Sequence, residues 1–226
     1  MPASIDKSNL TFLRAIAKNN NREWFAENKA KYTDALENTK AFVEAVKLGL
    51  EKTDEIEKAK LFRIYKDVRF SKDKTPYKSH WSCSFTRAGA RLRGGYYLQI
   101  KPGGDSMVGG GFYNPNPKDL KRIREEFKQD EGKAIIKIVN RKKFQETFGD
   151  MLGDKVKTSP RGYTIDDPAI DWLRHKSFYV MKKYKDSDVT DPNFAKEVVA
   201  TFKVIRPWFD YMSEVLTTDV NGVSLI

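Results

Sequence analysis

The spacing of the hydrophobic residues changes twice along this chain of 226 residues. Over 8–50 and again over 116–216 they recur every three or four residues, which predicts helices near both ends. Over 61–113, segments of alternating hydrophobic and polar residues are separated by turns rich in glycine and proline, which predicts strands. The sequence therefore predicts an α+β fold: a central, mainly antiparallel sheet with a β-hairpin, flanked by N-terminal and C-terminal helices.

The predicted sheet begins with a strand over 61–70, in which alternation separates two faces. The hydrophobic face, expected to be buried, carries Phe62, Ile64, Val68 and Phe70. The polar face carries Arg63, Tyr65, Asp67 and Arg69. Further strands are expected over 81–85 and 177–181, and a hairpin over 94–101 and 106–113. Single long helices are expected over 22–50 and 132–148, and a last one after Asp191-Pro192.

Hydrophobic residues make up 39% of the chain, which is enough for a sizeable core. No internal repeat and no low-complexity linker interrupts the sequence, so we expect a single domain over 1–226. Its parts are a helical N-terminal part (1–59), a strand-rich basic core (60–115) and a mainly helical C-terminal part (116–226).

The positive charge is concentrated in one segment. Residues 60–101 contain eleven basic and two acidic side chains, net +9, whereas the whole chain has a net charge of +11. A field this localised favours an anionic partner such as phosphate, carboxylate or nucleic acid. The alternative is a solvated surface with no ligand.

The polar face of the first predicted strand is the leading candidate for a site. Asp67 lies between Arg63 and Arg69 on that face and could hold a guanidinium rigid enough to bind an anion through two hydrogen bonds. A structural ladder of ion pairs is the competing interpretation. The predicted anion-binding residues are Arg63, Arg69, Lys72, Lys74 and Lys78. A second segment could contribute Arg161, Arg174, His175 and Lys176.

Other chemistry has weaker support in the sequence. If the site is catalytic, the candidates for proton transfer are Asp67, Asp73, His80 and Tyr65. The glycines of Gly103-Gly104 and Gly109-Gly110-Gly111 could let the backbone approach a phosphate, but turn and bulge geometry is the favoured explanation, and neither a P-loop nor a dinucleotide motif is present. One cysteine and two histidines cannot supply a four-ligand zinc site, so no metal and no cofactor is expected.

The sequence also bears on location. The single cysteine, Cys83, excludes an intramolecular disulfide, which fits a reducing compartment. No apolar run approaches the length of about 20 residues that spans a bilayer, and the first residues lack the pattern of a secretory signal. We therefore expect a cytoplasmic protein that does not contact membranes.

Four segments together resemble the family known as domain of unknown function 2461, found in bacteria and fungi. They are 20–32 with Asn20-Asn21-Arg22-Glu23-Trp24-Phe25, 63–78 with Arg63-Ile64-Tyr65-Lys66-Asp67-Val68-Arg69-Phe70, 95–113 with Gly109-Gly110-Gly111-Phe112-Tyr113, and 160–176 with Trp172-Leu173-Arg174-His175-Lys176. The resemblance covers nearly the whole chain and implies one continuous domain. It implies no activity, cofactor or catalytic residue.

Three functions follow from these observations. The first is binding of a phosphorylated or carboxylated small molecule at the basic sheet face, either as a binding protein or as an enzyme. The second is a nucleic-acid-binding module, which would need a wider basic surface with exposed aromatic residues. The third is a protein-interaction scaffold without ligand chemistry, marked by an exposed apolar patch.

Overall fold

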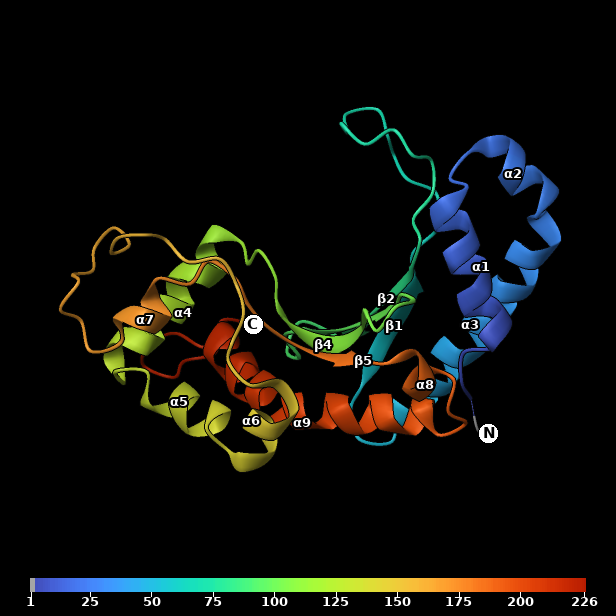
Figure 1. The fold of residues 1–226 in the computed structure, drawn as a ribbon. Helices are drawn as coiled ribbons and strands as arrows, with labels where there is room; N and C mark the ends of the chain where they lie inside the picture. The colour runs from blue at the N-terminus through green and yellow to red at the C-terminus, as the bar shows by residue number, and fades with distance from the viewer. Residues whose placement is uncertain (1–2) are drawn as a thin grey trace. The chain divides into compact units, whose positions relative to one another are not determined.

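The computed structural model describes residues 3–226 and has five strands in one antiparallel sheet with helices at both ends, which confirms the α+β prediction (Figure 1). The strand order in the sheet follows the order in the chain, β1-β2-β3-β4-β5. The strands are β1 Ile56–Leu61, β2 Trp81–Arg87, β3 Gly95–Ile100, β4 Ser106–Phe112 and β5 Phe178–Tyr184. The helices are α1 Lys7–Lys18, α2 Arg22–Glu27, α3 Lys29–Leu50, α4 Pro117–Gln129, α5 Lys133–Val139, α6 Lys142–Phe148, α7 Ile170–Leu173, α8 Asp186–Val189 and α9 Phe194–Thr217.

The hairpin and two of the other predicted strands are confirmed, but two helices are divided. The single helix expected over 22–50 is wrong, because α2 ends at Glu27 and α3 begins at Lys29, with Asn28 between them. The single helix expected over 132–148 is also wrong, because α5 ends at Val139 and α6 begins at Lys142. Asparagine stands at both breaks, and its side chain competes with the helical hydrogen bonds of the backbone.

The strand expected over 61–70 is wrong. The chain forms β1 just before this segment and leaves the sheet after Leu61, returning only at Trp81. Of the four side chains assigned to a buried face, only Ile64 is buried, and Phe70 is 95% exposed. β1 was missed because it is an edge strand, where charged residues such as Lys58 and Lys60 protect an unpaired edge and hide the alternation.

The chain divides into two compact units, each made of three segments. The first is Met1–Phe85, Tyr97–Val108 and Lys183–Ala200, and the second is Thr86–Tyr96, Gly109–Lys182 and Thr201–Ile226. The boundary falls inside α9 and inside each of the strands from β2 to β5. The single domain expected over 1–226 stays a prediction.

In the first unit, a buried asparagine connects three elements. Asn9 of α1 donates hydrogen bonds to the Ala35 carbonyl and the Thr39 hydroxyl of α3, both at 2.9 Å. Its side-chain oxygen accepts a bond of 2.8 Å from the indole N–H of Trp81 in β2. A buried amide satisfied in this way contributes specificity at little cost, whereas an unpaired one would be costly.

In the second unit, aromatic side chains and one buried arginine form the core. Tyr96 and Phe112 contact Phe209 of α9 with ring centroids 5.0 and 5.7 Å apart. The Arg87 side chain is fully buried and donates to the Asp210 carboxylate at 2.8 Å and to the Ser213 hydroxyl at 3.2 Å. This arginine therefore belongs to the interior of the unit.

Gly109 of β4 allows an unusually close approach to β5. A Cβ atom at this position would lie 1.8 Å from the Val180 carbonyl oxygen, which is backbone and cannot move aside. We expect Gly109→Ala to lower the free energy of unfolding by roughly 3 kcal/mol or more. Thermal denaturation should show a melting temperature roughly 6–12 °C lower.

Gly89→Ala is the control. An added Cβ there meets nothing within 4 Å, so only the backbone conformation at φ +67° opposes it, at a cost of about 1–2 kcal/mol. Equal losses of stability in the two variants would contradict the steric explanation.

Candidate functional site

Residues 62–80 form an arm between β1 and β2 that projects from the sheet edge (Figure 1). We call this segment the basic arm. Its two halves pair at the base, where Lys66 N–H donates to the Pro76 carbonyl and Lys78 N–H to the Ile64 carbonyl, both at 2.8 Å. An isolated antiparallel bridge joins Tyr65 to Tyr77. The arm carries six basic and two acidic side chains, net +4.

Tyr77 fixes the base of the arm to the N-terminal helices. The Asn20 side chain donates to the Tyr77 carbonyl at 2.9 Å and accepts from the Tyr77 N–H at 3.0 Å, as a neighbouring strand would. The Tyr77 ring stacks on Phe25 with centroids 4.1 Å apart and planes 14° apart. Two of the segments that carry the family resemblance, 20–32 and 63–78, therefore meet at this point.

The ammonium of an exposed lysine lies over the aromatic cluster beside this contact. Lys29 Nζ lies 5.2 Å from the ring centroid of Phe25, 4.8 Å from that of Tyr32 and 6.0 Å from that of Tyr65. It also donates a hydrogen bond of 3.2 Å to the Tyr65 hydroxyl. Cation–π attraction of this kind contributes about 0.5–2 kcal/mol per contact, so the cluster holds one positive charge next to the arm.

Several polar side chains of the arm bind one another. Arg69 donates to both oxygens of Asp67, through Nε at 2.9 Å and Nη2 at 2.6 Å, and this bond holds the pKa of the Asp67 carboxyl below its usual range. Lys66 donates to Asp73 at 2.8 Å and to Thr75 at 2.6 Å, and hydrogen bonds from Lys66 and Thr75 likewise lower the pKa of Asp73.

Two of the predicted catalytic residues, Asp67 and Asp73, take part in these contacts. The carboxylates of Asp67 and Asp73 stay ionised and bound to cations of the arm. They position the arm, and the Arg69 fork is already engaged within the chain. Lys74 donates to the Val68 carbonyl at 3.1 Å, and Lys72 is exposed.

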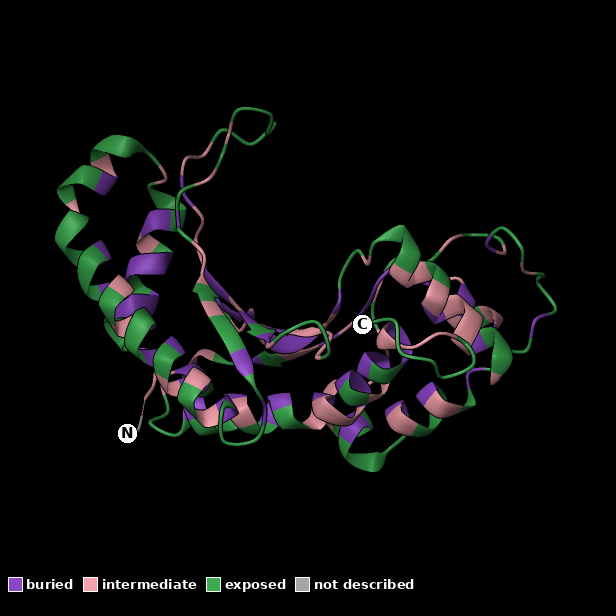
Figure 2. Ribbon diagram, turned by 180° about the vertical axis from the view of Figure 1, so that it is seen from behind, coloured by how far each residue is buried: buried purple, intermediate pink, exposed green. Residues whose placement is uncertain are grey.

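The tip of the arm presents Phe70 to solvent. This side chain is 95% exposed, and the Arg69 guanidinium carbon lies 5.9 Å from its ring centroid. Among residues 3–226 it is the most exposed of the large hydrophobic side chains. The tip of the arm is coloured as exposed in Figure 2. The alternation of residues predicted a buried environment for Phe70. Alternation can suggest that a strand has two different faces, but it does not show whether another element packs on one of them.

A second group of cations lies at the base of the arm, around His80. Burial first, and then the charges of Lys78, Lys101 and Lys66, together lower the pKa of His80 to about 4. Burial, followed by the charge of Arg63, also lowers the pKa of Lys78. Three lysines therefore act on a neutral imidazole, and Arg63 acts on one of them, Lys78.

The basic segment found in the sequence is divided by the structure. Arg87 is buried in the second unit, and Arg93 forms an ion pair with Asp119. Arg91 is exposed in the second unit, so the arm keeps most, but not all, of the solvent-accessible positive charge of this segment.

The second group of predicted residues belongs to the second unit. Arg174 donates to the carbonyls of Val156 and Lys157, both at 2.8 Å. His175 is 3% exposed, and its ring is stacked between Trp172 and Phe178. Arg161 and Lys176 are exposed. Their participation in a common site with the arm stays a prediction.

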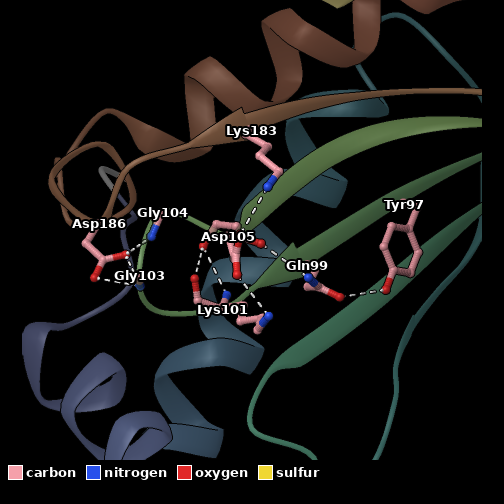
Figure 3. Close-up of polar contacts among 9 residues, drawn as sticks. Tyr97, Gln99, Lys101, Gly103, Gly104, Asp105, Lys183 and Asp186 are labelled. Atoms are coloured by element: carbon pink, nitrogen blue, oxygen red, sulfur yellow. Dashed lines mark hydrogen bonds and ion pairs between the residues drawn. The ribbon is translucent and has the colours of Figure 1, made fainter. Parts of the chain in front are cut away.

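The glycine-rich turn of the β3–β4 hairpin does bind an anion, but one from the same unit (Figure 3). Gly103 and Gly104 adopt φ values of 91° and 77°, and their N–H groups donate to the Asp186 carboxylate at 3.0 and 3.1 Å. Arg14 also binds this carboxylate. Lys101 and Lys183 bind Asp105 beside it, at 2.9 and 3.1 Å.

Thiol and metal chemistry find little support. Burial raises the pKa of the Cys83 thiol to about 12, so it is not a nucleophile at neutral pH. Within residues 3–226 no group of three or more His, Cys, Asp or Glu side chains could hold a metal ion. In the same part of the chain, no helix has the length and hydrophobicity needed to cross a membrane.

Comparison with known proteins gives one match. The model of a family described as "Conserved hypothetical protein (DUF2461)" matches residues 8–211. No curated protein matches the chain. No solved structure matches it.

The burial of His175 has a consequence for stability in acid. Burial, followed by the charge of Lys155, lowers its pKa from 6.5 to about 4. Between these pH values the unfolded chain takes up a proton that the folded protein refuses, so the free energy of unfolding falls as the pH falls. The loss should reach roughly 3 kcal/mol for this residue.

His175→Asn removes this titrating group and should reduce the pH dependence of stability between pH 6.5 and 4 by the share of His175, measured by urea denaturation. The comparison is with the wild-type slope over the same range, because the carboxylates and His80, whose pKa is also about 4, contribute equally to both proteins. An unchanged slope would contradict the assignment.

Proposed function

Because the chain belongs to the family of conserved hypothetical proteins DUF2461, whose description states no activity, we propose from its own residues that the basic arm binds single-stranded nucleic acid. This is the second of the three functions expected from the sequence. The sheet face that was to bind a small anion does not exist as a sheet, since 63–69 lies in the arm.

The observation that carries the proposal is Phe70. A phenylalanine exposed to 95% stabilises nothing inside the protein, and here it stands among Arg69, Lys72 and Lys74. Proteins that bind single strands without sequence preference combine such a ring, on which a base stacks, with cations that follow the phosphates. Tyr65, 39% exposed, offers a second ring at the base of the arm.

The distribution of the cations supports a polyanion over a small ligand. The cations at the tip accompany Phe70, whereas Lys78, which is affected by the charge of Arg63, acts on His80 at the base of the arm. A small anion needs cations that converge on one point, but a nucleic acid offers a phosphate to each of several separate cations. The internal ion pairs of Asp67 and Asp73 stiffen the arm and leave it a net positive charge.

Phe70→Ala tests this function. We expect the affinity for a fluorescent single-stranded RNA of 20 uridines to fall about tenfold, because stacking of a base contributes about 1–3 kcal/mol. Lys72→Gln with Lys74→Gln should reduce the slope of log K against log salt concentration by about 1.4, or about 0.7 per lost phosphate contact. Fluorescence anisotropy across a salt series measures both.

Tyr113→Ala is the matched control, since Tyr113 is also an exposed aromatic residue, at 74%, but lies outside the arm. Its affinity should equal that of the wild type. Flat, weak binding at low salt, or equal losses in the two aromatic variants, would overturn the proposal.

A small-molecule anion at the base of the arm is the second candidate, supported by the cations around His80. Inorganic phosphate bound there would stabilise the imidazolium and raise the pKa of His80 above its value of about 4. Proton NMR can follow this, because the chain has only two histidines and His175 serves as the internal reference. An unchanged His80 pKa at high phosphate would exclude the candidate.

A further inference from the structure

A cavity of about 280 Å³ lies in the second unit, between helices α5, α6 and α9. This is near the lower end of the range of about 300–1,000 Å³ found for small-molecule sites. Its apolar lining comes from Ile138, Phe144, Val204 and Pro207. None of these residues belongs to the basic arm or to its surroundings.

The remaining lining residues are all cations. Arg141, Lys143 and Lys203 line the cavity together with the apolar side chains, and no acidic residue lines it. All three are exposed. The cavity therefore combines an apolar wall with an excess of positive charge.

These three cations are not neutralised by the protein. Across residues 3–226, no carboxylate forms an ion pair with Arg141, Lys143 or Lys203. Their neighbours behave differently: Lys142 lies 3.9 Å from Glu146, and Arg206 donates to Asp210 at 2.7 Å. Arg141, Lys143 and Lys203, which line the cavity, are thus unpaired, whereas Lys142 and Arg206 beside it are paired.

Pro207 contributes to the apolar wall in a way few residues could. It stands inside α9, where proline has no N–H for the carbonyl of Lys203, four residues earlier. Its ring lines the cavity, and it is more rigid than the rotatable side chain that most other residues would place there. The wall is therefore rigid at this point, which lowers the entropy cost of binding an apolar group.

We propose that this cavity binds an anionic amphiphile, with its hydrocarbon chain against Ile138, Phe144, Val204 and Pro207 and its anionic head between Arg141, Lys143 and Lys203. Charge complementarity selects this class: a cationic or zwitterionic amphiphile would meet unpaired positive charge, and a purely polar anion would leave the apolar wall in water. The proposal does not depend on nucleic-acid binding by the arm.

Octanoate, below its micellar concentration, is a suitable probe, and isothermal titration with methyl NMR is the measurement. Octanoate should bind at least tenfold more tightly than octyltrimethylammonium, 1-octanol or acetate, and should shift the methyl signals of Ile138 and Val204. Equal binding of the four compounds, or shifts confined to other methyl groups, would overturn the proposal.

Lys203→Gln and Lys142→Gln form a matched pair, because each removes one positive charge and only Lys203 lines the cavity. Lys203→Gln should weaken octanoate binding threefold to tenfold, and Lys142→Gln less than twofold. Arg141→Gln provides a second variant should Lys203→Gln fold poorly. Equal effects of Lys142→Gln and the cavity variants would mean that octanoate responds only to net charge.

Discussion

The contact between Tyr77 and the N-terminal helices is the constraint on which the basic arm depends. Two hydrogen bonds with Asn20 and a stack on Phe25 hold one half of the arm, and the pairing of Ile64 with Lys78 holds the other. Without this base, 19 residues with a net charge of +4 would lose much of what orders them. With it, the tip is presented to solvent at a defined place.

Charge in this protein is used in two different ways. Arg87 is buried, and its guanidinium is satisfied by Asp210, Ser213 and the Arg93 carbonyl, so it stabilises the second unit. The arm instead keeps its cations in water, where ion pairs contribute little to stability and mainly restrict conformation. Basic residues thus contribute to packing in the second unit, whereas those of the arm produce a positive electrostatic potential at the surface.

The segments that matter could largely be found from the sequence, but their environments could not. The arm residues were identified by charge and by family resemblance, yet Phe70 was assigned to a buried face that does not exist. β1 was missed because Glu57, Lys58 and Lys60 mask the alternation of an edge strand. The Asp186 carboxylate of α8 meets the glycine-rich turn, and Lys203 meets Arg141 and Lys143, from distant segments of the chain, and residue spacing gives no signal of such contacts.

The sequence by itself determined the α+β class, the family, the position of the hairpin and the location of the positive charge, because these follow from local periodicity and composition. The tertiary structure decided which of those charges are free and which side chains are exposed. Both depend on what lies across from a residue, such as Asp210 for Arg87, or nothing at all for Phe70. The role of a charge or an aromatic ring depends on its neighbours in space. Neighbours that are distant in the sequence are brought together only by the complete tertiary structure.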